Sequence, residues 1–281
     1  MTTFILSSGV TSTVAVTHLD QLFVESGAIS TASIVRGSEA VSVGGQSLGD
    51  FIHSGGVESV LGLAIGTKIE AGAEHVLAGG TTSDVVLEDG VQTVVGLAIA
   101  TSIRGGEVEA YSGGIVSKAH VGSGGELDLE GGGHALETVV FSGGKLENDG
   151  GRTSGGEILF EATGVVFGGG TDSGLVVSGL VDVGLGGRGA LSGSFIRSNG
   201  IDVVWSQGTS DDVRVSSGGR EEVEALGSAM DNYFLSGARG EFASGGIANG
   251  LVVSSGGSVE FDHGAIGEEL TLRVGAQISA E

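Results

Sequence analysis

The chain has 281 residues, of which 57 are glycine, and it contains neither proline nor cysteine. Its 35 acidic and 12 basic residues give a formal net charge of −23 at pH 7, which argues against nucleic acid or an anionic membrane surface as a partner, because phosphates are neutralised by clustered Lys and Arg. With 40% hydrophobic residues and a mean hydropathy of +0.30, the chain is too apolar to be disordered.

The first residues, MTTFILSSGVTSTVAV, have no basic segment and no apolar core of the kind found in a secretory signal peptide. No stretch reaches 18 apolar residues, so we expect no membrane-spanning helix. The absence of cysteine excludes disulfides and thiolate metal sites without identifying a compartment.

Pairs of glycines recur along the chain, and short segments of alternating apolar residues precede most of them. Examples are VSVGG at 41–45, LDLEGG at 127–132 and VVSSGG at 252–257. A strand closed by a glycine turn and repeated without a break is typical of a solenoid. We therefore predict an all-β protein, a parallel β-helix (β-solenoid) of about fifteen coils of 17–19 residues. Residues 1–281 should form a single glycine-rich domain.

An internal sequence repeat supports this period, because residues 57–80 align with residues 91–114 at an offset of 34, or two coils. Each coil should contain two or three short strands, with glycine at corners that need a positive φ. In the C-terminal run Leu251-Val252-Val253, alternation predicts that Val253 points inward and Val252 outward.

The least regular stretch is 188–208, which is longer than a typical row and contains the only tryptophan, Trp205. An insertion in a solenoid often forms a loop on one face, where it can bind a ligand. The simpler interpretation, which we prefer, is that Trp205 fills the core.

Two short motifs match catalytic patterns by composition alone. Gly184–Gly189 fits the dinucleotide fingerprint G-x-G-x-x-G, but the following residues do not form the helix that this motif needs. Gly45–Gly49 fits the nucleophile elbow G-x-S-x-G, with Asp50 and His53 close behind. The first match is expected by chance among 57 glycines and the second falls in a repeat corner, so we assign neither a function.

The sequence indicates no metal or cofactor site. The six histidines lack zinc-ligand spacing, and the repeated calcium-binding nonapeptide of some β-helices is absent. We therefore assign no catalytic, cofactor-binding or metal residues and no cofactor. Loosely bound divalent cations remain an alternative. Three acidic pairs are predicted to lie on solvated faces: Asp211-Asp212, Glu221-Glu222 and Glu268-Glu269.

The rows SGGVESV (54–60), FSGGKLEN (141–148) and SSGGSVEF (254–261) resemble the repeats of AIDA-type autotransporter passengers. The resemblance covers essentially all of residues 1–281. It implies a right-handed parallel β-helix and a bacterial surface adhesin or self-associating protein, in which repeat Ser and Thr can carry sugars. It also implies an extracellular or cell-surface location, with a second copy of the chain or surface glycans as partners.

Three functions follow as hypotheses. The first is a non-enzymatic β-solenoid that presents a surface for adhesion, self-association or a structural layer. The second is a carbohydrate-active enzyme on the same fold. A polysaccharide lyase would need basic residues that converge on one face, whereas the basic residues here are scattered one per row, for instance Lys68, Arg104, Lys118 and Lys145. This scatter argues against a lyase but is compatible with a hydrolase that uses a pair of acids. The third is a head-to-tail filament subunit, since neither end of the sequence shows a capping element.

Overall fold

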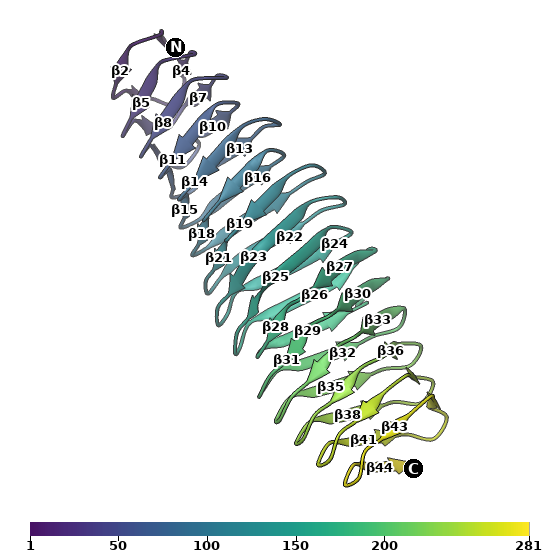
Figure 1. Ribbon diagram of the computed structural model, residues 1–281. Coiled ribbons are helices and arrows are strands. Elements are labelled where there is room, and N and C mark those ends of the chain that lie inside the picture. The colour runs from purple at the N-terminus through teal and green to yellow at the C-terminus, as the bar shows by residue number, and fades with distance from the viewer. Residues whose placement is uncertain (281) are drawn as a thin grey trace. The chain divides into compact units, whose positions relative to one another are not determined.

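The computed structural model describes residues 1–280, which contain 44 β strands and no helix (Figure 1). Each typical coil carries one longer strand and two shorter ones, for example β10 (Val57–Val60), β11 (Leu63–Ile65) and β12 (Lys68–Ile69). Each strand pairs in parallel with its equivalent in the next coil, as β10 does with β13 (Gly72–Val76). The chain is thus a parallel β-solenoid of about fifteen turns, and the predicted fold class is confirmed.

The chain divides into two units, Met1–Thr138 and the residues from Val139 onward. In the first unit the longer strands pair in the order β1 (Thr3–Leu6), β4 (Gln21–Val24), β7 (Ser38–Val41), β10, β13, β16 (Gly90–Val94), β19 (Gly106–Ala110) and β22 (Gly125–Leu129). Its shorter strands are β2 (Thr11–Ser12), β3 (Ala15–Val16), β5 (Ile29–Thr31), β6 (Ile34–Val35), β8 (Gln46–Leu48), β9 (Phe51–Ile52), β11, β12, β14 (Thr81–Ser83), β15 (Val86–Leu87), β17 (Leu97–Ile99), β18 (Ser102–Ile103), β20 (Ile115–Ser117) and β21 (His120–Val121). Strand β23 (His134–Val140) includes the division at Thr138. The prediction of a single domain stays a prediction.

The second unit repeats the arrangement. Its longer strands pair in the order β24 (Lys145–Asp149), β26 (Thr163–Phe167), β29 (Leu180–Val183), β32 (Ile201–Val204), β35 (Arg220–Val223), β38 (Arg239–Phe242), β41 (Ser258–Phe261) and β44 (Gln277–Ala280). Its other strands are β25 (Arg152–Ile158), β27 (Gly170–Ser173), β28 (Val176–Val177), β30 (Gly189–Ser192), β31 (Phe195–Ile196), β33 (Gly208–Asp211), β34 (Arg214–Val215), β36 (Ser228–Met230), β37 (Tyr233–Phe234), β39 (Ile247–Asn249), β40 (Val252–Val253), β42 (Ile266–Glu268) and β43 (Thr271–Leu272).

The register gives the length of each coil. Val57 pairs with Ala73, sixteen residues on, and Ala73 pairs with Val91, so the sequence repeat at an offset of 34 does span two coils. The longest described step joins Leu180 to Ile201, twenty-one residues on. Coil lengths therefore vary more widely than the predicted 17–19 residues.

Glycine pairs at the corners combine two different requirements. Gly79 has a φ of +90°, which favours glycine, but a Cβ there would meet nothing within 4 Å. At Gly80 the φ is ordinary, yet a Cβ would lie 2.1 Å from the carbonyl oxygen of Val60 in the preceding coil. The first glycine of this pair is therefore needed for backbone conformation and the second for close approach between coils.

Alternation along each strand places one set of side chains in the interior. Val253 is 1% exposed whereas Val252 is half-buried, so the predicted orientation of this strand is confirmed. Aliphatic residues fill most of the interior, and in the second unit the rings of Phe242 and Phe261 stack with centroids 4.9 Å apart. Stacked coils bury together what no single coil can bury alone.

The preferred interpretation of Trp205 is wrong. Its side chain is half-buried, and the indole nitrogen donates a hydrogen bond of 2.7 Å to Oδ1 of Asp182 in the preceding coil. The longer step from β29 to β32 includes the five-residue connection Gly184–Arg188 between β29 and β30. An indole with a polar partner at the rim meets its hydrogen-bonding need there, which the aliphatic interior does not offer.

Candidate functional site

A ladder of polar side chains runs inside the first unit, where the repeat pattern predicts apolar ones. Parallel register stacks Glu39 of β7 on Glu58 of β10, Glu58 on Glu74 of β13, and Glu74 on Gln92 of β16. All four side chains are completely buried. Their position follows from the pleat, because each lies two residues before an inward-facing valine and therefore shares its face.

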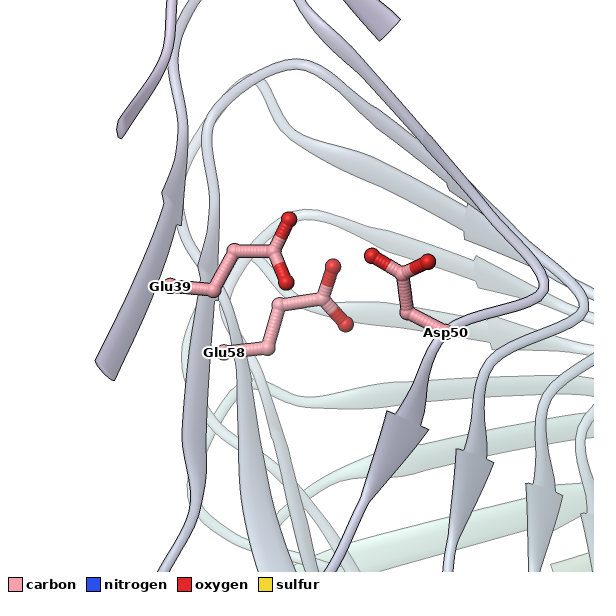
Figure 2. A group of neighbouring side chains, drawn as sticks. All are labelled: Glu39, Asp50 and Glu58. Atoms are coloured by element: carbon pink, nitrogen blue, oxygen red, sulfur yellow. The ribbon is translucent and has the colours of Figure 1, made fainter. Parts of the chain in front are cut away.

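Asp50 faces this ladder from the corner between β8 and β9, as Figure 2 shows. Its Oδ2 accepts hydrogen bonds from the hydroxyls of Ser30 (2.7 Å) and Ser47 (3.1 Å). Its Oδ1 accepts one of 2.7 Å from the backbone N–H of Ser33. One oxygen from each of Asp50, Glu39 and Glu58 lies within 4.8 Å of the others, so three carboxylates meet in the interior.

These buried carboxyls strongly resist ionisation. Burial raises the pKa of Glu39 well above its ordinary value, and the charge of Asp50 raises it further. Burial also raises the pKa of Glu58 well above its ordinary value, followed by the charges of Glu39 and Glu74. The pKa of Asp50 is raised by burial as well, although its hydrogen bonds from Ser30 and Ser33 lower it.

Farther along the same ladder, amide and hydroxyl groups replace carboxylates. Gln92 donates from Nε2 to Glu74 and to the Thr82 hydroxyl (3.3 Å), and its Oε1 accepts from Thr101 (3.3 Å). Burial raises the pKa of Glu74 to about 7, and the bond from Gln92 counteracts part of this rise. The glutamine thus compensates one buried carboxylate in a way that the cluster of three lacks.

The second unit has its own buried acids. Asp172 accepts from Asn148 Nδ2 at 2.6 Å, and burial raises the pKa of Asp172 to about 6. Asp202 of β32 stacks on Glu221 of β35, and both are completely buried. Burial raises the pKa of Asp202 well above its ordinary value, with the charge of Glu221 as the next cause.

The prediction that Glu221 lies on a solvated face is therefore wrong. Its Oε1 accepts from the Ser210 hydroxyl (2.5 Å) and from Asn232 Nδ2 (2.7 Å), and burial raises the pKa of Glu221 to about 7. Its neighbour Glu222 lies on the outer face, and the two other predicted acidic pairs, Asp211-Asp212 and Glu268-Glu269, are exposed. The alternation along the strand could have predicted the burial of Glu221. Glu221 lies two residues before the inward-facing Val223 and therefore points to the same side.

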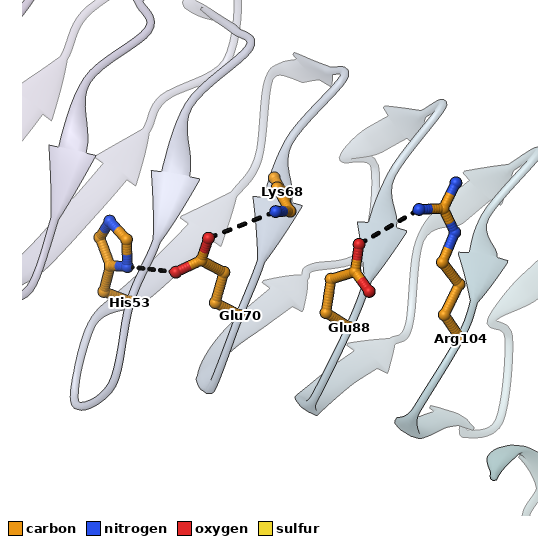
Figure 3. Close-up of polar contacts among 5 residues, drawn as sticks. All are labelled: His53, Lys68, Glu70, Glu88 and Arg104. Carbon is orange, nitrogen blue, oxygen red and sulfur yellow. Dashed lines mark hydrogen bonds and ion pairs between the residues drawn. The ribbon is translucent and has the colours of Figure 1, made fainter.

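On the outer face of the first unit, basic residues pair with acids of the same or adjacent coils. Figure 3 shows Glu70 between His53 Nδ1 (2.7 Å) and Lys68 Nζ (3.3 Å), and Arg104 beside Glu88 (3.2 Å). The hydrogen bond from Lys68 is the largest cause that lowers the pKa of Glu70. Lys118 pairs with Glu137 in the same unit, and in the second unit Lys145 pairs with Glu147. These bases balance local acids on the surface.

On the outer face of the second unit, three acids form a ladder. Glu222, Glu241 and Glu260 are consecutive partners in the register. Arg220 forms ion pairs with Glu222 and Glu241. The hollow beside this ladder has a volume of about 220 Å³. A ligand pocket usually has several hundred cubic ångströms, so this hollow is small for a substrate.

An aromatic and cationic column lies on another outer face of the second unit. The guanidinium carbon of Arg214 lies 5.5 Å from the ring centre of Phe195 and 5.6 Å from that of Tyr233. Phe195, Arg214 and Tyr233 are consecutive register partners, so each ring lies one coil from the cation. A cation held between two rings at the surface is a contact that a planar partner such as a sugar ring can extend.

The two catalytic-looking motifs do not form sites. Ser47 is completely buried in β8, while His53 points outward to Glu70, so Ser47 and His53 do not pair. Strand β30, and not a helix, begins at Gly189, as expected. Within residues 1–280 no helix is long and apolar enough to cross a membrane.

Exposed serines form a column at one corner of the second unit. Ser198, Ser217, Ser236 and Ser255 recur every nineteen residues, and each lies beside a glycine of the following coil. A Cβ on Gly218 would lie 2.9 Å from Ser198 Oγ, so the glycine leaves space around this hydroxyl.

No protein-family model and no curated protein matches this sequence. Six chains of solved structures do match. The chain is similar to a fragment of TibA. That crystal structure is of a hyper-glycosylated TibA fragment whose modification TibC catalyses. The match has a TM-score of 0.74 and 27% sequence identity, and it covers 99% of this chain and 92% of the TibA chain. The similarity supports the passenger-like solenoid, whereas membership of the AIDA-type group stays a prediction.

Proposed function

We propose that this chain is a non-enzymatic β-solenoid that presents its outer surface for adhesion or self-association, in an extracellular or cell-surface location. The observation that carries the proposal is the match to the TibA fragment along nearly the whole chain. A solenoid offers each outer column as a repeated set of contacts, so weak interactions at successive coils add together. The column of Phe195, Arg214 and Tyr233 is the strongest candidate contact.

The arrangement of carboxylates disfavours the carbohydrate-active alternative. A glycosidase needs two carboxyl groups on either side of a bound sugar. The five acids beside the hollow of about 220 Å³ have little space for one. Among residues 1–280, a larger hollow of about 660 Å³ is lined by a single carboxylate, that of Glu260. The carboxylates grouped in the interior, such as Asp202 and Glu221, are out of reach of a polysaccharide.

The test uses beads coated with the purified chain. We expect coated beads to aggregate and an excess of soluble chain to inhibit the aggregation. The Arg214→Ala variant should aggregate less, whereas Arg36→Ala, which removes an arginine of the first unit, should aggregate normally. Absence of both bead aggregation and binding to a glycan array would overturn the proposal. So would the release of reducing ends from a polysaccharide incubated with the chain.

A second candidate function is that of a glycosylation acceptor, which the serine column favours. The similar TibA fragment is hyper-glycosylated, and the exposed hydroxyls of Ser198, Ser217, Ser236 and Ser255 are regularly spaced. Co-expression with TibC followed by intact-mass measurement tests the idea. We expect added sugar mass that falls when all four serines are changed to alanine, and no change when the buried Ser30, Ser33 and Ser47 are changed. An unmodified mass would refute this acceptor role.

A further inference from the structure

Three carboxylates from three successive parts of the first unit meet without a counter-charge. Glu39 comes from β7, Asp50 from the corner before β9, and Glu58 from β10, and all are completely buried (Figure 2). Among the described residues, no ion pair includes any of them. Burying an uncompensated charge is very unfavourable, so the cluster must be neutralised by protons or by a cation.

The unsatisfied oxygens distinguish this cluster from ordinary buried carboxyls. Neither carboxylate oxygen of Glu39 has a hydrogen-bond partner, although the side chain is completely buried and points toward Asp50. Glu58 Oε1 also lacks a partner, while its Oε2 accepts a bond of 3.3 Å from Thr67. Asp50, in contrast, is held by Ser30 and Ser33. The cluster thus combines one anchored carboxylate with two that leave three oxygens available, both of Glu39 and Oε1 of Glu58.

We propose that Glu39, Asp50 and Glu58 form an internal binding site for a hard divalent cation, with Ca²⁺ as the best match. Calcium binds oxygen at about 2.4 Å, so oxygens on opposite sides of the ion lie up to about 4.8 Å apart. The three ligand oxygens lie within 4.8 Å of one another. The donors are all oxygen, and the Ser30 and Ser47 hydroxyls beside Asp50 add neutral oxygens, a set that suits Ca²⁺ better than zinc or copper.

The ion links residues of two adjacent coils. Glu39 and Glu58 are register partners in adjacent coils, and Asp50 lies on the opposite wall. Bound Ca²⁺ therefore stabilises the stacking of these coils. Because the site is fully enclosed, the ion enters as the coils form and exchanges slowly once they have closed.

The experiment refolds the whole chain from denaturant with CaCl₂ or with EDTA. Elemental analysis after gel filtration should find one Ca²⁺ per chain, and thermal unfolding should occur at a higher temperature than in the EDTA sample. Glu39→Gln and Glu58→Gln should each lose the ion and the calcium-dependent rise. In EDTA these variants should be at least as stable as the unchanged chain, because each removes a carboxyl group that must take up a proton in order to be buried.

Glu221→Gln is the matched control, since it removes a completely buried carboxyl in the other unit. This variant should keep both the bound ion and the calcium-dependent rise. If Ca²⁺, Mg²⁺ and Mn²⁺ are not retained and do not change the unfolding temperature, the cluster is neutralised by protons and the proposal is overturned. An equal calcium effect in all three variants indicates binding to the acidic surface and also overturns it.

Discussion

Replacing Glu221 by glutamine should increase stability at neutral and alkaline pH. The side chain is completely buried, and its Oε1 accepts hydrogen bonds from Ser210 and Asn232. Glutamine has the same shape, keeps an acceptor oxygen, and adds a donor beside Asp202, the register partner of Glu221. The substitution therefore preserves the contacts of the neutral acid and removes its ability to ionise.

The magnitude follows from the pKa. Burial raises the pKa of Glu221 from 4.5 to about 7. Below about pH 4.5 the group is protonated in both the folded and unfolded states, so it adds no pH dependence. As the pH rises from there to about 7 the unfolded state ionises first, and stability falls. A tenfold difference in acidity between the folded and unfolded states corresponds to about 1.4 kcal/mol, so the loss above pH 7 is roughly 3 kcal/mol.

Urea unfolding across this pH range measures the effect. The unchanged chain and Glu221→Gln should have similar free energies of unfolding in mild acid. With increasing pH the curves should separate, until the variant is more stable by roughly 3 kcal/mol above pH 7. A variant that is less stable than the unchanged chain above pH 7, or a separation that does not depend on pH, would refute the reasoning.

Five other substitutions test the packing by denaturant midpoint. Val253→Asp should destabilise the chain by roughly 3–5 kcal/mol, because it places a charge in the interior, while Val252→Asp should cost less than about 1 kcal/mol. Equal losses in the two variants would show that the strand orientation is wrong. Gly80→Ala should lower the free energy of unfolding by about 3 kcal/mol through a clash with a carbonyl of the preceding coil, and Gly79→Ala by about 1 kcal/mol through its positive φ alone. A larger loss for Gly79→Ala than for Gly80→Ala would contradict the roles assigned to the two glycines. Phe242→Ala removes a stacked, completely buried ring and should cost roughly 3–5 kcal/mol, so a loss below about 1 kcal/mol would mean that the ring is not packed as described.

The repeat alone predicts the fold of this chain. Glycine pairs at a regular spacing and alternating apolar residues specify strands, corners and coils, because both signals are local and recur in every row. They also specify that Val253 points inward and Val252 outward. The same alternation, applied to acidic residues, would have placed four glutamates in the interior: Glu39, Glu58, Glu74 and Glu221. Because unpaired carboxylates are rarely buried, the chemical nature of these residues instead favours a position on the solvated surface.

Only the tertiary structure decides which of these groups meet. Asp50 lies eleven residues from Glu39 and eight from Glu58, and no local pattern shows that a corner residue on one wall faces a strand residue on the other. Their proximity depends on the width of the coil and on the register between coils, which are properties of the closed solenoid. The same holds for Trp205, whose partner Asp182 lies in the preceding coil, because a side chain at the rim is positioned by the stacking of its neighbours.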